Sequence, residues 1–159
     1  MPSKVSAGIR LFRKREHGLE VFLAHPGGPF FAKKDEGIWT IPKGEINPEE
    51  DPLKAAIREF YEEIGVALDS SKTFTPLGDI TQKSGKLVHA WAYEGDIDPT
   101  HKVSGGSFNM QWPPRSGKTA TFQEIDRAEF FTIDQAKIKL IEAQRPFLER
   151  LLVFSRIKT

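Results

Sequence analysis

The stretch from Gly44 to Val66, GEINPEEDPLKAAIREFYEEIGV, decides how this chain folds. Its second half predicts a helix over residues 51–64. Asp51 is a favoured N-cap residue, Pro52 suits the first helical position, and Gly65 suits the left-handed conformation that often ends a helix. The stretch therefore predicts a helix with a defined start and a sharp stop.

The predicted helix has two unlike faces. At about 100° per residue its apolar side chains share one stripe, which we expect to face the core: Leu53, Ile57, Phe60 and Ile64. The other side carries three glutamates at helical spacing: Glu59, Glu62 and Glu63. Such neighbours repel one another by a few tenths of a kcal/mol per pair. From the helix alone, a solvated surface and a functional acidic cluster are equally good interpretations.

The wider stretch resembles the Nudix box, the sequence motif of the Nudix hydrolase family. The motif's fixed positions are all filled, in order, by Gly44, Glu50, Arg58, Glu59, an apolar residue at Phe60, Glu62, Glu63, Gly65 and an apolar residue at Val66. The one departure is Phe60, where the family more often has an aliphatic residue. Upstream, Gly37, Trp39 and Pro42 match the usual approach to the box. The similarity extends from about Val5 to about Phe154.

This resemblance implies an α/β fold, the Nudix-type α/β/α sandwich with a mixed β-sheet between helices, as a single domain over residues 1–159. The pattern of residues predicts strands at Val5–Arg13, Glu20–His25, Ile38–Ile41, Phe74–Thr81, Leu87–Tyr93 and Ala128–Thr132. It predicts further helices at Asp134–Leu140 and Ala143–Ile157 and a long polar loop at Thr100–Thr119.

The resemblance also implies hydrolysis of a phosphoanhydride bond with Mg²⁺, for which Mn²⁺ is a substitute. It assigns the metal to Glu59, Glu62, Glu63 and the carbonyl of Gly44, whose lack of a side chain we expect to permit an unusual backbone geometry. Glu50 supports the site, and Arg58 pairs with it. The general base is either a box glutamate or Glu124, which stands just before the last predicted strand.

The substrate is expected to be a nucleotide. Lys43 stands where many boxes have Gly, as in the branch that acts on diadenosine polyphosphates and inositol pyrophosphates. Arg115 and Lys118 are candidates for holding additional phosphates, and Trp39 for stacking on a base. Dinucleoside polyphosphates and nucleoside triphosphates are the first alternatives, followed by RNA 5′ ends and ADP-ribose.

Composition narrows the remaining possibilities. The net charge is +1 and the chain contains no cysteine, so it lacks a global positive field for nucleic acid and has neither disulfides nor thiolate zinc sites. No apolar run is long enough to span a membrane. We expect a cytoplasmic monomer or homodimer without membrane contact, and nucleic acid as a partner only at RNA 5′ ends. A non-catalytic nucleotide-binding Nudix module, or an unrelated domain with a solvated acidic helix, remains the alternative.

Overall fold

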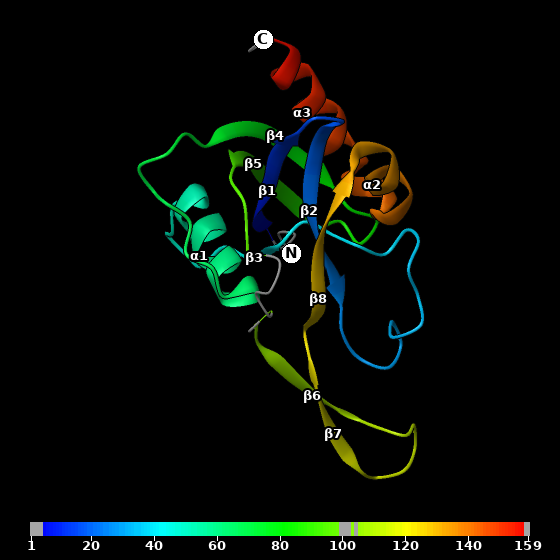
Figure 1. The fold of residues 1–159 in the computed structure, drawn as a ribbon. Helices are drawn as coiled ribbons and strands as arrows, with labels where there is room; N and C mark the ends of the chain where they lie inside the picture. The colour runs from blue at the N-terminus through cyan, green and yellow to red at the C-terminus, as the bar shows by residue number, and fades with distance from the viewer. Residues whose placement is uncertain (1–4, 99–102, 104, 158–159) are drawn as a thin grey trace.

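The computed structural model describes residues 5–98, 103 and 105–157 and contains a mixed six-stranded sheet with the strand order β4-β5-β1-β2-β8, in which β3 also pairs with β1 (Figure 1). The strands of this sheet are β1 (Val5–Arg15), β2 (Gly18–Pro26), β3 (Lys43–Glu45), β4 (Thr75–Thr81), β5 (Leu87–Glu94) and β8 (Ile125–Thr132). The helices are α1 (Pro52–Ile64), α2 (Ile133–Lys139) and α3 (Arg145–Ile157), with a 3₁₀ turn, η1 (Glu142–Gln144).

Strand β1 organises the sheet because it is buried on both faces. It pairs with β2 as an antiparallel hairpin and with β5 in parallel. Its residues from Ser6 to Phe12 are all buried, which is the pattern of a central strand rather than an edge strand. The parallel pairing of β1 with β5 requires a long crossover, and the box helix α1 lies within that crossover.

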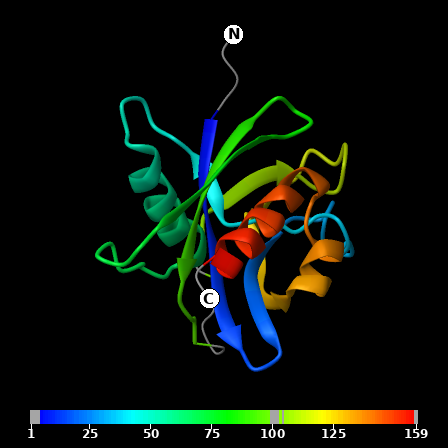
Figure 2. The same ribbon diagram turned by 90° about the horizontal axis from the view of Figure 1, so that it is seen from above.

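Helices cover both faces of the sheet, so the predicted α/β/α sandwich is confirmed. Helix α1 lies on one face and α2 with α3 on the other (Figures 1 and 2). One core contains Phe60 and Ile64 of α1, packed with Ile9 and Phe22 of the sheet. The other core contains Phe147 and Leu151 of α3, along with Trp39 and other side chains of the opposite face.

The box helix begins and ends where its sequence predicts. The carboxylate of Asp51 accepts a hydrogen bond from the backbone N–H of Lys54 at 3.1 Å, and Gly65 adopts a left-handed conformation with φ 85°. The buried stripe, however, differs from the prediction. Phe60 and Ile64 are buried, but Leu53 and Ile57 are half-buried, whereas Ala55 and Ala56 are fully covered. Small side chains on the covered face let the helix lie close to β1 and β3.

Two other predictions are wrong. Ile38–Ile41 is not a strand: Trp39 and Thr40 make only isolated bridges to Leu140 and Ala24, and the strand follows them at β3. Thr100–Thr119 is not a simple loop, because it contributes to a hairpin of β6 (Ser107–Gln111) and β7 (Thr119–Gln123). These strands alternate apolar residues with neutral polar residues, and the polar residues concealed the alternation.

The C-terminal part is helical as predicted. Helix α2 begins with a capping box in which the side chains of Thr132 and Gln135 each bind the other's backbone N–H. Helix α3 packs Phe147, Leu148 and Leu151 into the core beneath it. Within the part of the chain that the structure describes, no helix is long and apolar enough to cross a membrane.

We expect Phe60→Ala to destabilise the protein by about 3 to 5 kcal/mol, because it leaves a cavity in the α1 core where the ring is fully buried. The matched control is Tyr61→Ala, at the next position of the same helix, where 57% of the residue's surface is exposed. This change should alter stability by about 0.5 kcal/mol or less. Urea unfolding of both variants tests the packing, and equal losses would contradict it.

Candidate active site

The guanidinium of Arg58 joins the loop before the box helix to the helix itself. Its Nε and Nη2 donate to the two carboxylate oxygens of Glu50 at 2.8 and 2.9 Å, and Nη2 also donates to the carbonyl of Glu45 at 3.1 Å. These hydrogen bonds lower the pKa of Glu50 to about 2. The structure therefore contains the Arg58–Glu50 pair that the resemblance implies, and the pair fixes the loop against α1.

The same guanidinium also gathers two of the three helical glutamates. Nη1 of Arg58 donates to Glu59 at 2.7 Å and to Glu62 at 3.0 Å. Glu59 is half-buried, whereas Glu62 lies at the exposed edge of the cluster. Because both carboxylates reach one nitrogen atom, they converge on the same point of the helix surface.

The third glutamate lies deeper. An oxygen of Glu63 accepts a hydrogen bond from the backbone N–H of Lys43 at 3.2 Å. Burial raises the pKa of Glu63 to about 8, and the charges of Glu59 and Glu124 act in the same direction. Burial also raises the pKa of Glu59 and lowers the pKa of the half-buried Lys43 ammonium. The site is thus a partly desolvated acidic cluster with one lysine beside it.

Gly44 leaves space for a neighbouring side chain. It lies in β3 opposite Ala7, and it is not among the glycines with positive φ, so the expected unusual backbone geometry is wrong. A Cβ atom at this position would lie 1.9 Å from an oxygen of Glu59. The missing side chain therefore leaves room for the Glu59 carboxylate between β3 and α1.

Glu124 joins this cluster although it is far away in the sequence. It follows β7 directly, and its backbone N–H donates to the carbonyl of Gly106 at 2.9 Å while its carbonyl accepts from Gly27 at 2.8 Å. Its charge raises the pKa values of both Glu59 and Glu63. The structure thus brings the predicted carboxylate to the box helix.

Two glycines that the sequence reading missed make this approach possible. A Cβ atom at Gly105 would lie 2.4 Å from the carbonyl oxygen of Glu63, and one at Gly106 would lie 3.4 Å from a carboxylate oxygen of Glu124. The segment therefore has no space for a side chain where Gly105 meets the end of α1, and at Gly106 it lies within van der Waals contact of Glu124. The adjacent Gly-Gly pair in the sequence was the available signal, but nothing in the sequence alone placed it beside the box.

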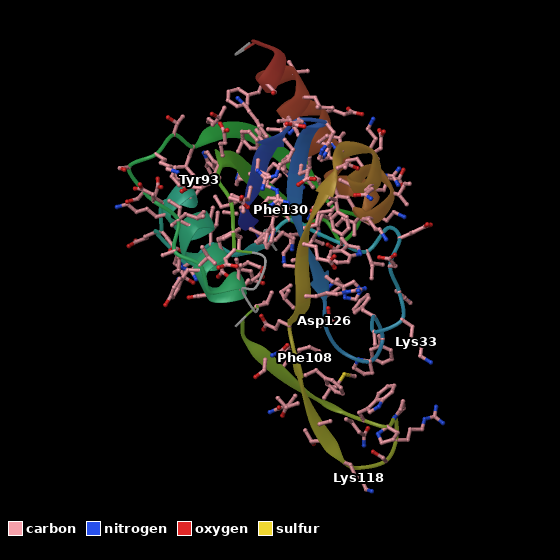
Figure 3. All side chains as sticks on the ribbon, in the orientation of Figure 1. Lys33, Tyr93, Phe108, Lys118, Asp126 and Phe130 are labelled. Atoms are coloured by element: carbon pink, nitrogen blue, oxygen red, sulfur yellow. The ribbon has the colours of Figure 1, made fainter. Side chains whose placement is uncertain are left out.

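The candidate substrate-binding residues are not all together. Lys43 lies at the acidic cluster, as its electrostatic coupling to Glu63 and Glu59 shows. Trp39 is only 1% exposed and packs against Phe131 with its indole N–H bound to Asp35, so the prediction that it stacks on a base is wrong. Arg115 and Lys118 lie in the turn between β6 and β7, and Figure 3 shows Lys118 at the end of the hairpin remote from α1.

The carboxylates have the chemistry of a site for a hard divalent cation, since they offer several oxygen donors at one edge of the domain. Even so, no three histidine, aspartate or glutamate side chains among the described residues are close enough together to form a ready-made metal site. In the structure Nη1 of Arg58 instead binds one oxygen each of Glu59 and Glu62. These residues fit a cation if those two carboxylates turn from Arg58 toward Glu63.

Comparison with known proteins agrees with this geometry. A sequence model of the NUDIX domain matches residues 2–151. An RNA pyrophosphohydrolase from Rhodopseudomonas palustris is 36% identical over 66 residues, which cover 42% of this chain and 38% of that protein. An RNA pyrophosphohydrolase from Gluconacetobacter diazotrophicus is 35% identical over 68 residues, which cover 41% and 38%. The chain thus spans about two fifths of the length of these curated relatives.

Solved structures share the fold at low sequence identity. A binary complex of an Ap4A hydrolase from C. elegans has a TM-score of 0.64 and 21% identity, with 95% of this chain and 98% of that chain covered. The NUDIX domain of Shewanella oneidensis NrtR, complexed with ADP ribose, has a TM-score of 0.64 and 14% identity, with 99% and 90% covered. These likenesses confirm the architecture.

The Glu50–Arg58 pair predicts a defined pH dependence. The pKa of Glu50 lies at about 2 instead of the ordinary 4.5, so the stability that it contributes is complete above about pH 4.5 and is lost as the pH falls toward 2. Glu50→Gln should therefore lower the free energy of unfolding at pH 7, and its difference from the wild type should shrink below pH 4.5. Urea unfolding from pH 7 to pH 3 measures this, with Glu149→Gln on α3 as the control; a constant difference would contradict the pairing.

Proposed function

The chain belongs to the Nudix family, and we propose that it hydrolyses the phosphoanhydride bond of a nucleoside diphosphate linked to another moiety. Nudix proteins generally require a divalent metal, and we propose Mg²⁺ for this chain, with Mn²⁺ as a substitute because both accept hard oxygen ligands. The supporting observation is the meeting of the box glutamates with Glu124 at one partly buried edge of the domain. We treat residues 1–159 as one domain, because both cores share a single sheet.

We assign the ion to the carboxylates of Glu59, Glu62 and Glu63, with the carbonyl of Gly44 as a further donor. When bound, it would neutralise phosphate charge and lower the pKa of the attacking water. Arg58 and Glu50 are positioning residues, since their hydrogen bonds hold the loop that carries Gly44 against α1. Lys43 contributes the positive charge beside the cluster that a phosphate oxygen requires.

We propose Glu124 as the general base. Within the described residues its carboxylate forms no hydrogen bond or ion pair, so it is free to take a proton from water. Glu63 is the alternative base, but one of its oxygens already accepts the N–H of Lys43. Placing the base on the segment after β7 lets α1 supply the charge that holds the metal while another element moves the proton.

Two substrate classes call for a direct test. Dinucleoside polyphosphates are favoured by Lys43 at the start of the box and by the shared fold with an Ap4A hydrolase. RNA 5′ ends are favoured by the curated RNA pyrophosphohydrolases, whose similarity covers about two fifths of this chain. Both classes contain a nucleoside diphosphate in a longer phosphate chain, so one site serves either. A nucleotide-binding module without catalysis is the alternative and requires binding without turnover.

Incubation with Mg²⁺ and a panel of nucleotides, dinucleoside polyphosphates, nucleotide sugars and 5′-triphosphorylated RNA tests the proposal. We expect cleavage of a diphosphate linkage in at least one of them, identified by the mass of the products. Glu63→Gln should lower turnover about a hundredfold or more while leaving the fold intact. The matched control Glu149→Gln, on the opposite helix layer, should leave it unchanged. If no substrate were cleaved in the presence of Mg²⁺, and Mg²⁺ did not raise the melting temperature, the proposed hydrolase activity would be refuted.

A further inference from the structure

The β6–β7 hairpin forms a two-stranded sheet of its own, separate from the main sheet (Figure 1). One of its faces presents only neutral polar side chains, all exposed: Ser107, Asn109, Gln111, Thr119, Thr121 and Gln123. The other face is half-buried. A two-stranded hairpin alone is marginally stable in water, so its contacts with the rest of the protein determine its position.

Aromatic contacts hold this hairpin against the loop that follows β2. The Phe108 ring lies against Gly28, where a Cβ atom would come within 2.8 Å of it, and the rings of Phe30 and Trp112 meet edge to face at 5.7 Å. Phe30 is 57% exposed and Phe31 is 37% exposed. Large exposed rings grouped in this way indicate a contact surface, and flat rings of this kind can stack on nucleobases.

Cations surround these rings. Lys33 and Lys34 lie in the loop, Arg115 and Lys118 lie in the hairpin turn, and none of the four forms an ion pair with a carboxylate in the described part of the chain. The hairpin from Ser107 to Gln123 has no acidic residue. By contrast, Arg13 and Arg15 both pair with Asp96, and Arg13 also pairs with Glu20. The positive charge of the hairpin and loop is therefore local and available to a polyanion.

The far end of this surface is the hairpin turn that carries Arg115 and Lys118, and it lies at a distance from Glu124 that only a long ligand can span. Lys118 lies six positions before Glu124 along the extended β7, which corresponds to about 20 Å. At about 3.4 Å per nucleotide, about six stacked nucleotides span this distance, whereas one nucleotide does not. A chain of phosphates and bases that begins at Glu124 would run along the hairpin toward Arg115.

We propose that the β6–β7 hairpin, together with loop residues 28–34, binds single-stranded nucleic acid whose 5′ phosphates lie at the carboxylate cluster. In that last respect the inference rests on the proposed function. Phe30, Phe31 and Trp112 supply stacking, Lys33, Lys34, Arg115 and Lys118 contact phosphates, and the neutral polar face of the hairpin offers hydrogen bonds without repelling charge. The net charge of +1 excludes a global positive field for nucleic acid, but the positive charge of this surface is local.

Fluorescence anisotropy with 3′-labelled RNA strands of 2, 4, 6 and 12 nucleotides, in EDTA to prevent hydrolysis, tests the surface. We expect affinity to rise up to about six nucleotides and then level off. The double variant Arg115→Gln/Lys118→Gln should weaken binding about tenfold and reduce the salt dependence by about one to two counterions, because each neutralised phosphate releases about one counterion. The control Lys83→Gln/Lys137→Gln makes the same change in net charge on other elements and should bind normally.

Trp112→Ala should weaken binding about tenfold by removing a stacking platform, provided that its melting curve matches the wild type. If the melting curve of Trp112→Ala differs from that of the wild type, the double variant Arg115→Gln/Lys118→Gln, whose side chains are exposed, tests the proposal instead. Binding that is independent of length, equal loss in both double variants, or binding of duplex RNA as tightly as single strands would overturn the proposal. The proposal would also be overturned if this surface bound a protein but no RNA.

Kinetics separate this surface from the active site. The double variant Arg115→Gln/Lys118→Gln should raise the KM for 5′-triphosphorylated RNA about tenfold without altering kcat. It should hydrolyse a mononucleotide as well as the wild type does. Glu63→Gln should show the reverse pattern, with normal RNA binding in EDTA and little turnover. Binding of RNA strands without any hydrolysis would refute the proposed function and support the nucleic-acid-binding surface. Hydrolysis without binding of RNA strands would refute only the nucleic-acid-binding surface.

Discussion

The contact on which the site depends is the five-way engagement of the Arg58 guanidinium. It binds both oxygens of Glu50, the carbonyl of Glu45 and one oxygen each of Glu59 and Glu62. Neighbouring glutamates on a helix repel one another, and a planar cation with several donors offsets that repulsion more effectively than a lysine would. Together with the hydrogen bond that the backbone N–H of Lys43 donates to Glu63, the guanidinium joins β3 and the loop after it to α1.

The sequence predicted those helices and strands whose ends are determined by neighbouring residues. The caps at Asp51 and Gly65, the β1–β2 hairpin and the two C-terminal helices follow from neighbouring residues, because hydrogen bonds and backbone conformation within a few positions set them. The β6–β7 hairpin was missed since its alternation uses neutral polar residues and lacks β-branched aliphatic runs. Ile38–Ile41 was misassigned because apolar residues that cross beneath a helix look like a short strand.

The site was predictable only where the motif itself places residues. Spacing on one helix brings Glu59, Glu62 and Glu63 together, but burial of Trp39 in the opposite core depends on how α2 and β8 pack. Likewise, a sequence cannot show that the Glu59 side chain occupies the space that a Cβ atom at Gly44 would take. Both features depend on packing between residues that are far apart in the sequence, and a local sequence pattern carries no information about such packing.

Glu124 is at once the root of the hairpin and a member of the acidic cluster, and this dual position has a geometric consequence. Because side chains alternate along a strand, removing one residue from β7 would exchange the two faces of the part of β7 beyond the deletion, relative to Glu124. The exposed polar row of β7 would then face inward. The length of β7 therefore determines which of its side chains face outward from a hairpin whose base holds Glu124.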